Sequence, residues 1–130
     1  PVPTGAGRGG RDPALSPDGQ TLYFVQTRPG GTDADIWTSR WDPAAKGWGG
    51  AAPLPVVNTL GDERGPRPTA DGRGLVFYRE ARGTGRTSWH LSAFDPDGEL
   101  SSVVELETPA GGGTHPNPAA DGSVMYYASG

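Results

Sequence analysis

The sequence predicts an all-β protein made of repeated, four-stranded antiparallel blades, and three observations support this. An Asp-Gly pair followed by an aromatic strand occurs at positions 18–19, 71–72 and 121–122, which are 53 and then 50 residues apart. A fixed period of this length is typical of repeat architectures. Apolar residues alternate over short runs and do not recur at helical spacing over any long window. The 22 glycines and 14 prolines stand largely between these runs, as expected of turns.

Each repeat is expected to contribute four short strands. The first repeat supplies strands over residues 12–16, 20–26, 34–40 and 47–54. The second supplies 66–69, 73–80, 87–94 and 100–107, and the third supplies only 116–119 and 123–128. A tight turn joins the first two strands of each repeat, because glycine tolerates positive φ and aspartate bonds its own backbone. The turn residues are Asp18, Gly19, Asp71, Gly72, Asp121 and Gly122.

The second strand of each repeat is apolar on both faces. In the first repeat, Leu22 and Phe24 point to one side, while Tyr23 and Val25 point to the other. Such a strand belongs to a sheet that is covered on both faces. We therefore expect the blades to stack face to face, with Phe24 and its equivalent Phe77 filling the core between them.

The strands add up to about two and a half β-propeller blades in a single segment, residues 1–130. Blade 1 covers about 12–54, blade 2 about 66–107 and a half blade about 115–128. Closed propellers typically have about 4–8 blades, so this chain is not expected to close alone. Its uncovered faces and strand edges predict a protein partner: further blades, a second copy in a homo-oligomer, or another protein.

The composition excludes several classes of function. The chain has 130 residues and a net charge of −4, and this mild acidity argues against a nucleic-acid partner. No apolar run approaches the roughly 20 residues that span a bilayer as a helix. The absence of cysteine excludes disulfides and thiolate sites. The sequence begins at Pro1 and its one methionine is Met125, so we expect a processed product or an excerpt of a longer chain.

Several motifs taken together resemble a known repeat family. They are "DPALSPDGQTLYF" at 12–24, "DIW" at 35–37, "GWG" at 47–49, and the link "NTLGDERGPRP" at 58–68. This combination resembles the TolB-type, WD-like β-propeller repeat of bacterial envelope proteins, which often accompanies an OmpA-type domain. The resemblance implies a propeller with a periplasmic or cell-surface location. That family has no shared catalytic residues, so no catalytic residue is predicted and the chain is not expected to be an enzyme. The second repeat departs from the pattern, with "TSW" in place of "DIW".

Aligning the repeats on their Asp-Gly turns places variable polar residues on the innermost strands, which line the central channel of a propeller. The candidates for a binding site at the channel mouth are Asp12, Arg64, Arg67, His115 and Asn117. The alternative is that these are solvated residues near strand ends, bonded to backbone or water.

No metal, cofactor or catalytic site is predicted. His90 and His115 lack the convergent spacing of a zinc site. The oxygen-rich stretches 30–36 and 61–64 match no calcium loop, and their aspartates are expected to stabilise turns. Ser88 and His90 share a strand face but lack the strand–turn–helix elbow of a serine hydrolase.

The function that the sequence favours is a non-enzymatic propeller module that binds or scaffolds proteins in the bacterial cell envelope. One alternative is the propeller domain of a prolyl-oligopeptidase-like hydrolase, whose catalytic domain would lie outside these residues. Another is a carbohydrate-binding propeller that uses aromatic platforms. The tryptophans Trp37, Trp41, Trp48 and Trp89 suit either such a platform or packing between blades.

Overall fold

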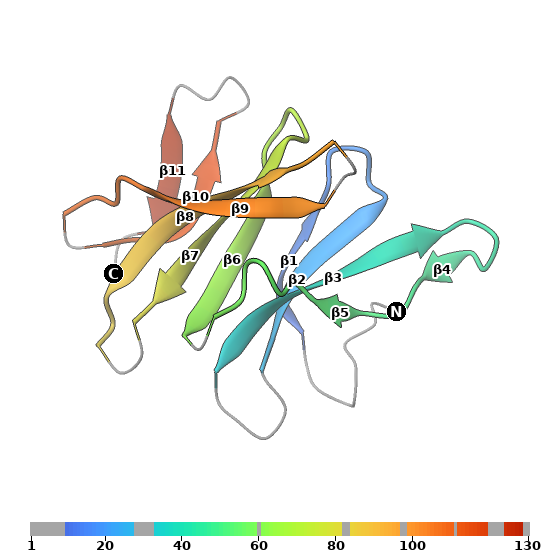
Figure 1. Cartoon of the computed structure of the whole chain (residues 1–130), viewed down its shortest axis with the longest axis horizontal. Coiled ribbons are helices and arrows are strands. Elements are labelled where there is room, and N and C mark those ends of the chain that lie inside the picture. Colours follow the sequence, from blue (N-terminus) through green and yellow to red (C-terminus); the bar gives the residue numbers. More distant parts are fainter. Residues whose placement is uncertain are drawn as a thin grey trace.

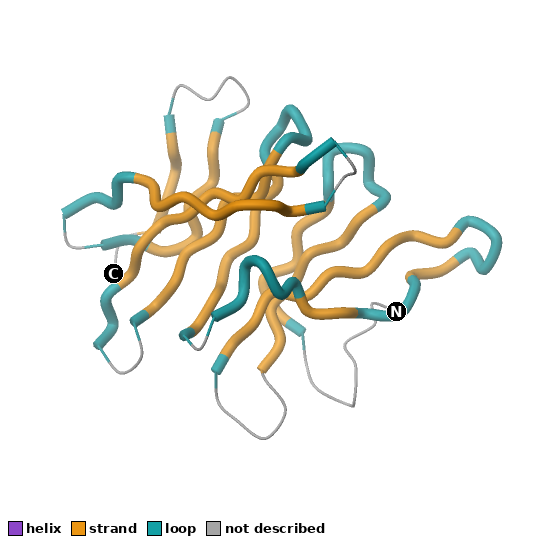
Figure 2. The backbone as a smooth tube through the Cα atoms, viewed as in Figure 1, coloured by secondary structure: helices purple, strands orange, loops and turns teal. Residues whose placement is uncertain are grey.

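The fold consists of β-strands joined by turns, shown in Figures 1 and 2. The computed structural model describes residues 10–27, 33–59, 61–81, 84–96, 99–110, 112–119 and 124–128. None of these residues forms a helix, so the described part contains no helix able to cross a membrane. The strands are β1 (Arg11–Leu15), β2 (Thr21–Thr27), β3 (Ala34–Asp42), β4 (Gly47–Trp48), β5 (Ala52–Pro53), β6 (Asp62–Pro68), β7 (Gly74–Glu80), β8 (Thr87–Phe94), β9 (Leu100–Leu106), β10 (Thr114–Pro118) and β11 (Met125–Ala128).

The strands form three antiparallel sheets. The first has the order β1-β2-β3, with β4 and β5 both pairing with β3. The second has the order β6-β7-β8-β9, and the third contains β10 and β11. The predicted all-β class is confirmed. We call the three sheets blade 1, blade 2 and the half blade, in chain order.

The predicted fourth strand of blade 1 is wrong, because residues 47–54 do not form one continuous strand. They form β4 and β5, of two residues each, which pair with different parts of β3: Trp48 lies opposite Trp41, and Pro53 lies opposite Trp37. Gly49, Gly50 and Ala51 separate the two strands, and Pro53 has no N–H to donate to a ladder. This edge of blade 1 is therefore interrupted.

The innermost strands contain a repeated irregularity that the sequence analysis missed. A register shift of the bulge type occurs in β1, β6 and β10. A residue with left-handed backbone lies at each shift: Asp12 at φ 53°, Gly65 at φ 58° and His115 at φ 55°. The bulge in β6 extends that strand to Asp62, four residues before the predicted start.

The core lies between blades 1 and 2. Its buried members are Tyr23, Val25, Ala34, Ile36, Val57, Leu75, Phe77 and Leu100. Phe77 is fully buried there, as expected. The expectation for Phe24 is corrected: it is 1% exposed, but it alternates with Tyr23 and Val25 and so lies on the opposite face of blade 1.

The Asp-Gly turns show why the motif recurs. Asp18 Oδ1 accepts the Ser16 hydroxyl at 2.6 Å, and Asp71 Oδ1 accepts the Thr69 hydroxyl at 2.6 Å. Each carboxylate also accepts the backbone N–H two residues later, and the glycines that follow have φ of 72° and 73°. These hydrogen bonds, the hydroxyl first, lower the pKa of both carboxyls. The third turn, at 121–122, lies outside the described residues.

Candidate binding site

Two of the predicted channel residues meet at one end of the innermost strands. Figure 1 shows β6 between β1 and the half blade, which brings the three bulges together. His115 Nε2 lies 3.3 Å from Asp12 Oδ2, and the same oxygen accepts the Gly65 N–H at 3.3 Å. The Asp12 carboxylate therefore contacts blade 2 and the half blade at once. The His115 side chain is 44% exposed, so the contact is open to solvent.

Gly65 makes this close approach possible. A Cβ at this position would lie 2.7 Å from the Tyr78 ring and 3.4 Å from the His115 Cα. The Tyr78 and His115 rings pack edge to face, with centroids 5.2 Å apart. Burial raises the pKa of Tyr78 to about 12, and the negative charge of Asp12 adds to the shift. The open part of the site therefore presents an imidazole and a carboxylate, which are suited to binding polar groups, while the Tyr78 ring is buried.

The other three predicted residues lie apart from this contact. Arg64 pairs with Asp62 of its own strand, with Nη2 and Oδ2 3.5 Å apart. Arg67 contributes to a separate shallow pocket of about 390 Å³, together with Pro13, Ala14, Leu15, Leu22 and Trp48. Asn117 is exposed and lies opposite Tyr126 in the β10–β11 ladder. The structure thus brings two of the five candidates into contact, and their role in binding stays a prediction.

The link between blades 1 and 2 contains functional residues of another kind, which join the blades. Asn58 Oδ1 accepts the Ile36 N–H at 2.8 Å, and Asn58 Nδ2 donates to the Ile36 carbonyl at 2.9 Å. Asp62 Oδ1 accepts the Ala34 N–H at 2.7 Å. These side chains supply β3 with the backbone partners that a neighbouring strand would otherwise provide. The link motif was visible in the sequence, but its spacing alone did not reveal this role.

A buried carboxylate follows in the same link. Glu63 is fully buried, and its oxygens accept the N–H and hydroxyl of Thr59 at 2.7 and 2.8 Å. Arg79 Nε lies 3.2 Å from Glu63 Oε2, and Arg79 Nη2 donates to the Val57 carbonyl at 2.9 Å. Burial raises the pKa of Glu63, and the Thr59 hydrogen bonds and Arg79 oppose that rise. This cluster joins β6 and β7 to the link.

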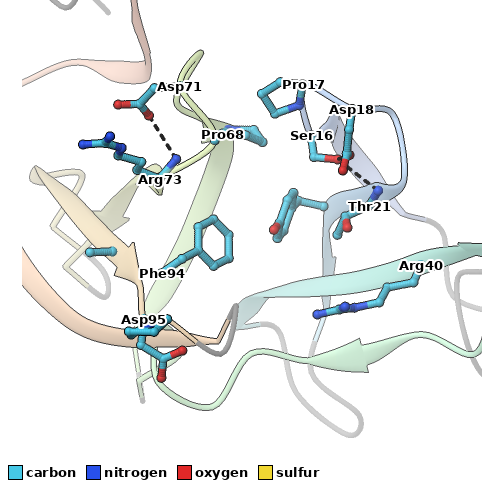
Figure 3. Close-up of a pocket in the computed structure, with 14 residues that line it drawn as sticks. Ser16, Pro17, Asp18, Thr21, Arg40, Pro68, Asp71, Arg73, Phe94 and Asp95 are labelled. Atoms are coloured by element: carbon cyan, nitrogen blue, oxygen red, sulfur yellow. Dashed lines mark hydrogen bonds between the residues drawn. The ribbon is translucent and has the colours of Figure 1, made fainter.

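An open groove of about 880 Å³ lies between blades 1 and 2, at the end opposite the Asp12–His115 contact. Figure 3 shows the Phe94 ring between the two Asp-Gly turns, with Arg40 on the blade 1 side. The prolines Pro17, Pro68 and Pro96 and the carboxylates of Asp18, Asp71 and Asp95 also line the groove. The groove is lined by an aromatic ring, prolines, and side chains of positive and negative charge, so its lining does not indicate one class of ligand.

Ser88 and His90 do form a hydrogen bond, with Oγ and Nε2 2.8 Å apart. The His90 ring is buried and stacks on Phe77, with centroids 5.5 Å apart. Burial lowers the pKa of His90, and the positive charge of Arg79 lowers it further. Neither residue lines either of the two pockets described above. The pair therefore packs within the blade 2 sheet, and within the described ranges no three His, Asp or Glu residues converge as metal ligands.

The tryptophans pack mainly on neighbouring aromatic rings. Trp41 and Trp48 meet edge to face across the β3–β4 hairpin, with centroids 5.5 Å apart. Trp89 is buried against Tyr127 of the half blade, with centroids 5.1 Å apart, and its Nε1–H donates to the Gly113 carbonyl. Two of the four predicted aromatic candidates therefore pair within blade 1, and a third joins blade 2 to the half blade.

Comparison with known proteins bears on the fold. No family model and no curated protein matches this sequence. Among solved structures, the chain is similar to the crystal structure of TolB from Acinetobacter baumannii, with a TM-score of 0.63 and 24% sequence identity. The match covers 93% of this chain and 26% of the TolB chain, so this chain spans about a quarter of that structure's length. The chain therefore has a TolB-like fold: part of a β-propeller, built of antiparallel blades.

Proposed function

We propose that this chain is a non-enzymatic segment of a β-propeller that binds or scaffolds proteins within a larger assembly of the bacterial cell envelope. The likeness of its fold to TolB supports an envelope propeller, periplasmic or at the cell surface. The proposal requires no cofactor and no nucleic acid.

One observation carries the proposal: the outer face of the half blade is exposed where the equivalent faces of the blades are covered. Tyr126 of β11 is 65% exposed. Its equivalents in the repeat, Tyr23 of β2 and Val76 of β7, are 5% and 2% exposed. Each of those two is covered by the next sheet along the chain. A large aromatic side chain left open at this position is what a protein partner or a further blade would cover.

The Asp12–His115 contact supplies a polar counterpart at the channel mouth. We expect a partner that docks at the inner strands to exchange hydrogen bonds with these two side chains, because both are accessible.

A photo-crosslinking experiment in the native bacterium tests this proposal. The gene is expressed at its natural length with p-benzoyl-phenylalanine at position 126, or as a matched control at Ala45, an exposed turn residue of blade 1. Osmotic shock then separates periplasmic from cytoplasmic protein. We expect the chain in the envelope fraction and a specific crosslink to another polypeptide from position 126 only.

Two results would contradict the proposal. A cytoplasmic location would remove the envelope assignment. A crosslink confined to the same polypeptide, mapped by mass spectrometry, would assign the cover to further blades and remove the case for an intermolecular interaction at this face.

A further inference from the structure

The groove between blades 1 and 2 has a lining of mixed character, but its hydrogen bonds show which polar groups remain available to a ligand. We propose that this groove binds the carboxyl terminus of a peptide. Arg40 and the Tyr23 hydroxyl bind the terminal carboxylate, and the Phe94 ring packs on an apolar last side chain. The inference rests on the proposed function and deepens it, because it names the kind of segment that a protein partner would present.

Tyr23 is a buried side chain whose hydroxyl is available to the groove. The residue is 5% exposed, belongs to the core between the blades and contributes to the groove lining. Its hydroxyl has no hydrogen-bond partner in the part of the chain that the structure describes. The equivalent residue of blade 2, Val76, has no polar side-chain atom, so the blade itself does not require this hydroxyl. Buried polar groups are normally hydrogen-bonded, so an open one at this position indicates a ligand.

The electrostatics at this hydroxyl make it a donor. Burial raises the pKa of Tyr23, the positive charge of Arg40 opposes that rise, and the negative charge of Asp18 adds to it. The hydroxyl therefore keeps its proton at neutral pH, and it can donate a hydrogen bond to an acceptor in the groove.

Arg40 supplies an accessible positive charge beside this donor. Its side chain is exposed, and Figure 3 shows its guanidinium directed toward the Phe94 side of the groove. Among the described residues this guanidinium forms no ion pair, whereas those of Arg64 and Arg79 each pair with an acidic residue of the link. A guanidinium can hold a carboxylate through two parallel N–H···O bonds, so Arg40 and the neighbouring hydroxyl together suit a carboxylate.

The acidic residues of the groove favour a peptide over a more highly charged anion. Asp18, Asp71 and Asp95 line the groove with Arg40 and Arg73, so its lining carries one more negative than positive charge. This excess repels a phosphate dianion, whereas a peptide terminus carries a single charge and also presents backbone N–H groups. In the described part of the chain, the turn hydrogen bonds of Asp18 and Asp71 all go to Oδ1. Their Oδ2 atoms can therefore accept the N–H groups of the peptide.

The apolar part of the groove suits the last side chain of such a peptide. Phe94 is half-buried between the two Asp-Gly turns, as Figure 3 shows, and Pro17, Pro68 and Pro96 also line the groove. None of these four side chains donates or accepts a hydrogen bond, so they favour an apolar neighbour. The volume of about 880 Å³ leaves room for a short peptide segment.

The test measures binding of labelled peptides to the purified protein, at its natural length, by fluorescence anisotropy. The probe has the sequence Gly-Ser-Gly-Ala-Leu, a dye on its amino end and a free carboxyl end. Two matched peptides carry an amidated end, or glycine in place of the last leucine. We expect saturable binding of the probe. Amidation should weaken it by about tenfold or more, because the guanidinium loses its charged partner, and the glycine peptide should bind about threefold or more weakly.

Substitutions in the protein test the roles of its side chains. Arg40→Ala should weaken binding by about tenfold or more, and Tyr23→Phe, which removes only the hydroxyl, by about threefold or more. The matched control is Arg86→Ala, which removes an exposed arginine that does not line the groove and should leave binding within about twofold. Circular dichroism should be unchanged in all three variants, because Arg40 and Arg86 are exposed and phenylalanine keeps the Tyr23 ring.

Four results would overturn the inference. The first three are no saturable binding by the folded protein, equal binding of the free and amidated peptides, and equal losses in Arg40→Ala and Arg86→Ala. The fourth is equally tight binding of an amidated peptide with an internal glutamate, which would assign the groove to side-chain carboxylates. Failure here leaves the crosslinking test at Tyr126 unaffected, because that residue lies in the half blade and does not line the groove.

Discussion

Removing the Phe77 ring is the most direct test of the packing between blades. Phe77 is fully buried, belongs to the cluster shared by blades 1 and 2, and stacks on His90. Phe77→Ala leaves a cavity in contact with both sheets, and such truncations cost about 3–5 kcal/mol. Domains of this size are typically stable by about 5–15 kcal/mol, so the variant should lose a large fraction of its stability. Urea denaturation followed by tryptophan fluorescence and circular dichroism measures the change.

The control is Phe77→Leu, which keeps most of the volume and should cost less than about 1.5 kcal/mol. The dependence of the unfolding free energy on urea should be the same in all three proteins, as expected if they expose similar surface on unfolding. A loss below about 1 kcal/mol for Phe77→Ala would refute the inter-blade core, because a cavity between two close-packed sheets should destabilise the fold by more than this.

The remaining predictions concern the link and the bulge. Asn58→Ala should cost about 1–3 kcal/mol in the same urea assay, because it leaves a backbone N–H of β3 unpaired, and no loss would mean that water replaces the amide. Gly65→Ala should be clearly more destabilising than Gly72→Ala: both have positive φ, but the new Cβ lies 2.7 Å from Tyr78 at position 65 and meets nothing within 4 Å at position 72. Similar losses would show that the bulge relaxes freely. Burial raises the pKa of Glu63 above its usual 4.5, so the stability it contributes is complete below that value and is lost as pH rises through the higher folded pKa. Unfolding curves from acid to neutral pH should show this slope in the wild type, and a Glu63→Gln variant with the same slope would contradict it.

The second strands and their turns could be predicted because their signals are local. An Asp-Gly pair followed by alternating apolar residues specifies both a turn and a strand, and the structure has β2 and β7 within one residue of expectation. The prediction of the fourth strand of blade 1 was wrong, because pairing with two different parts of β3 divides these residues into β4 and β5. The role of the link could not be predicted, because the Asn58 amide bonds the backbone of Ile36, which is 22 residues away in the sequence.

The candidate site was partly predictable for a related reason. Aligning the turns placed Asp12 and His115 at equivalent positions of the inner strands β1 and β10, which lie on either side of β6. It also grouped Arg64 and Arg67 at the same mouth, because both belong to an innermost strand. The bulge adds one residue between these two arginines, which lie opposite Tyr78 and Val76 of β7. Each has a separate environment: Arg64 pairs with Asp62, and Arg67 lines the pocket beside Trp48. The sequence did not predict such a bulge where its left-handed position is occupied by Asp12 or His115 and not by glycine.

The way each blade meets the next has a consequence for how such a chain can change over time. The start of β3 contacts the segment entering β6, through the Ala34 N–H and Asp62. The start of β8 contacts the segment entering β10 with the donor and acceptor exchanged: the Gly113 N–H donates to Thr87 Oγ1. Both of these contacts join a unit to its successor. Duplicating one period of the gene would insert a complete blade and recreate the same junction on both sides, so the array can lengthen without redesign of the blades already present.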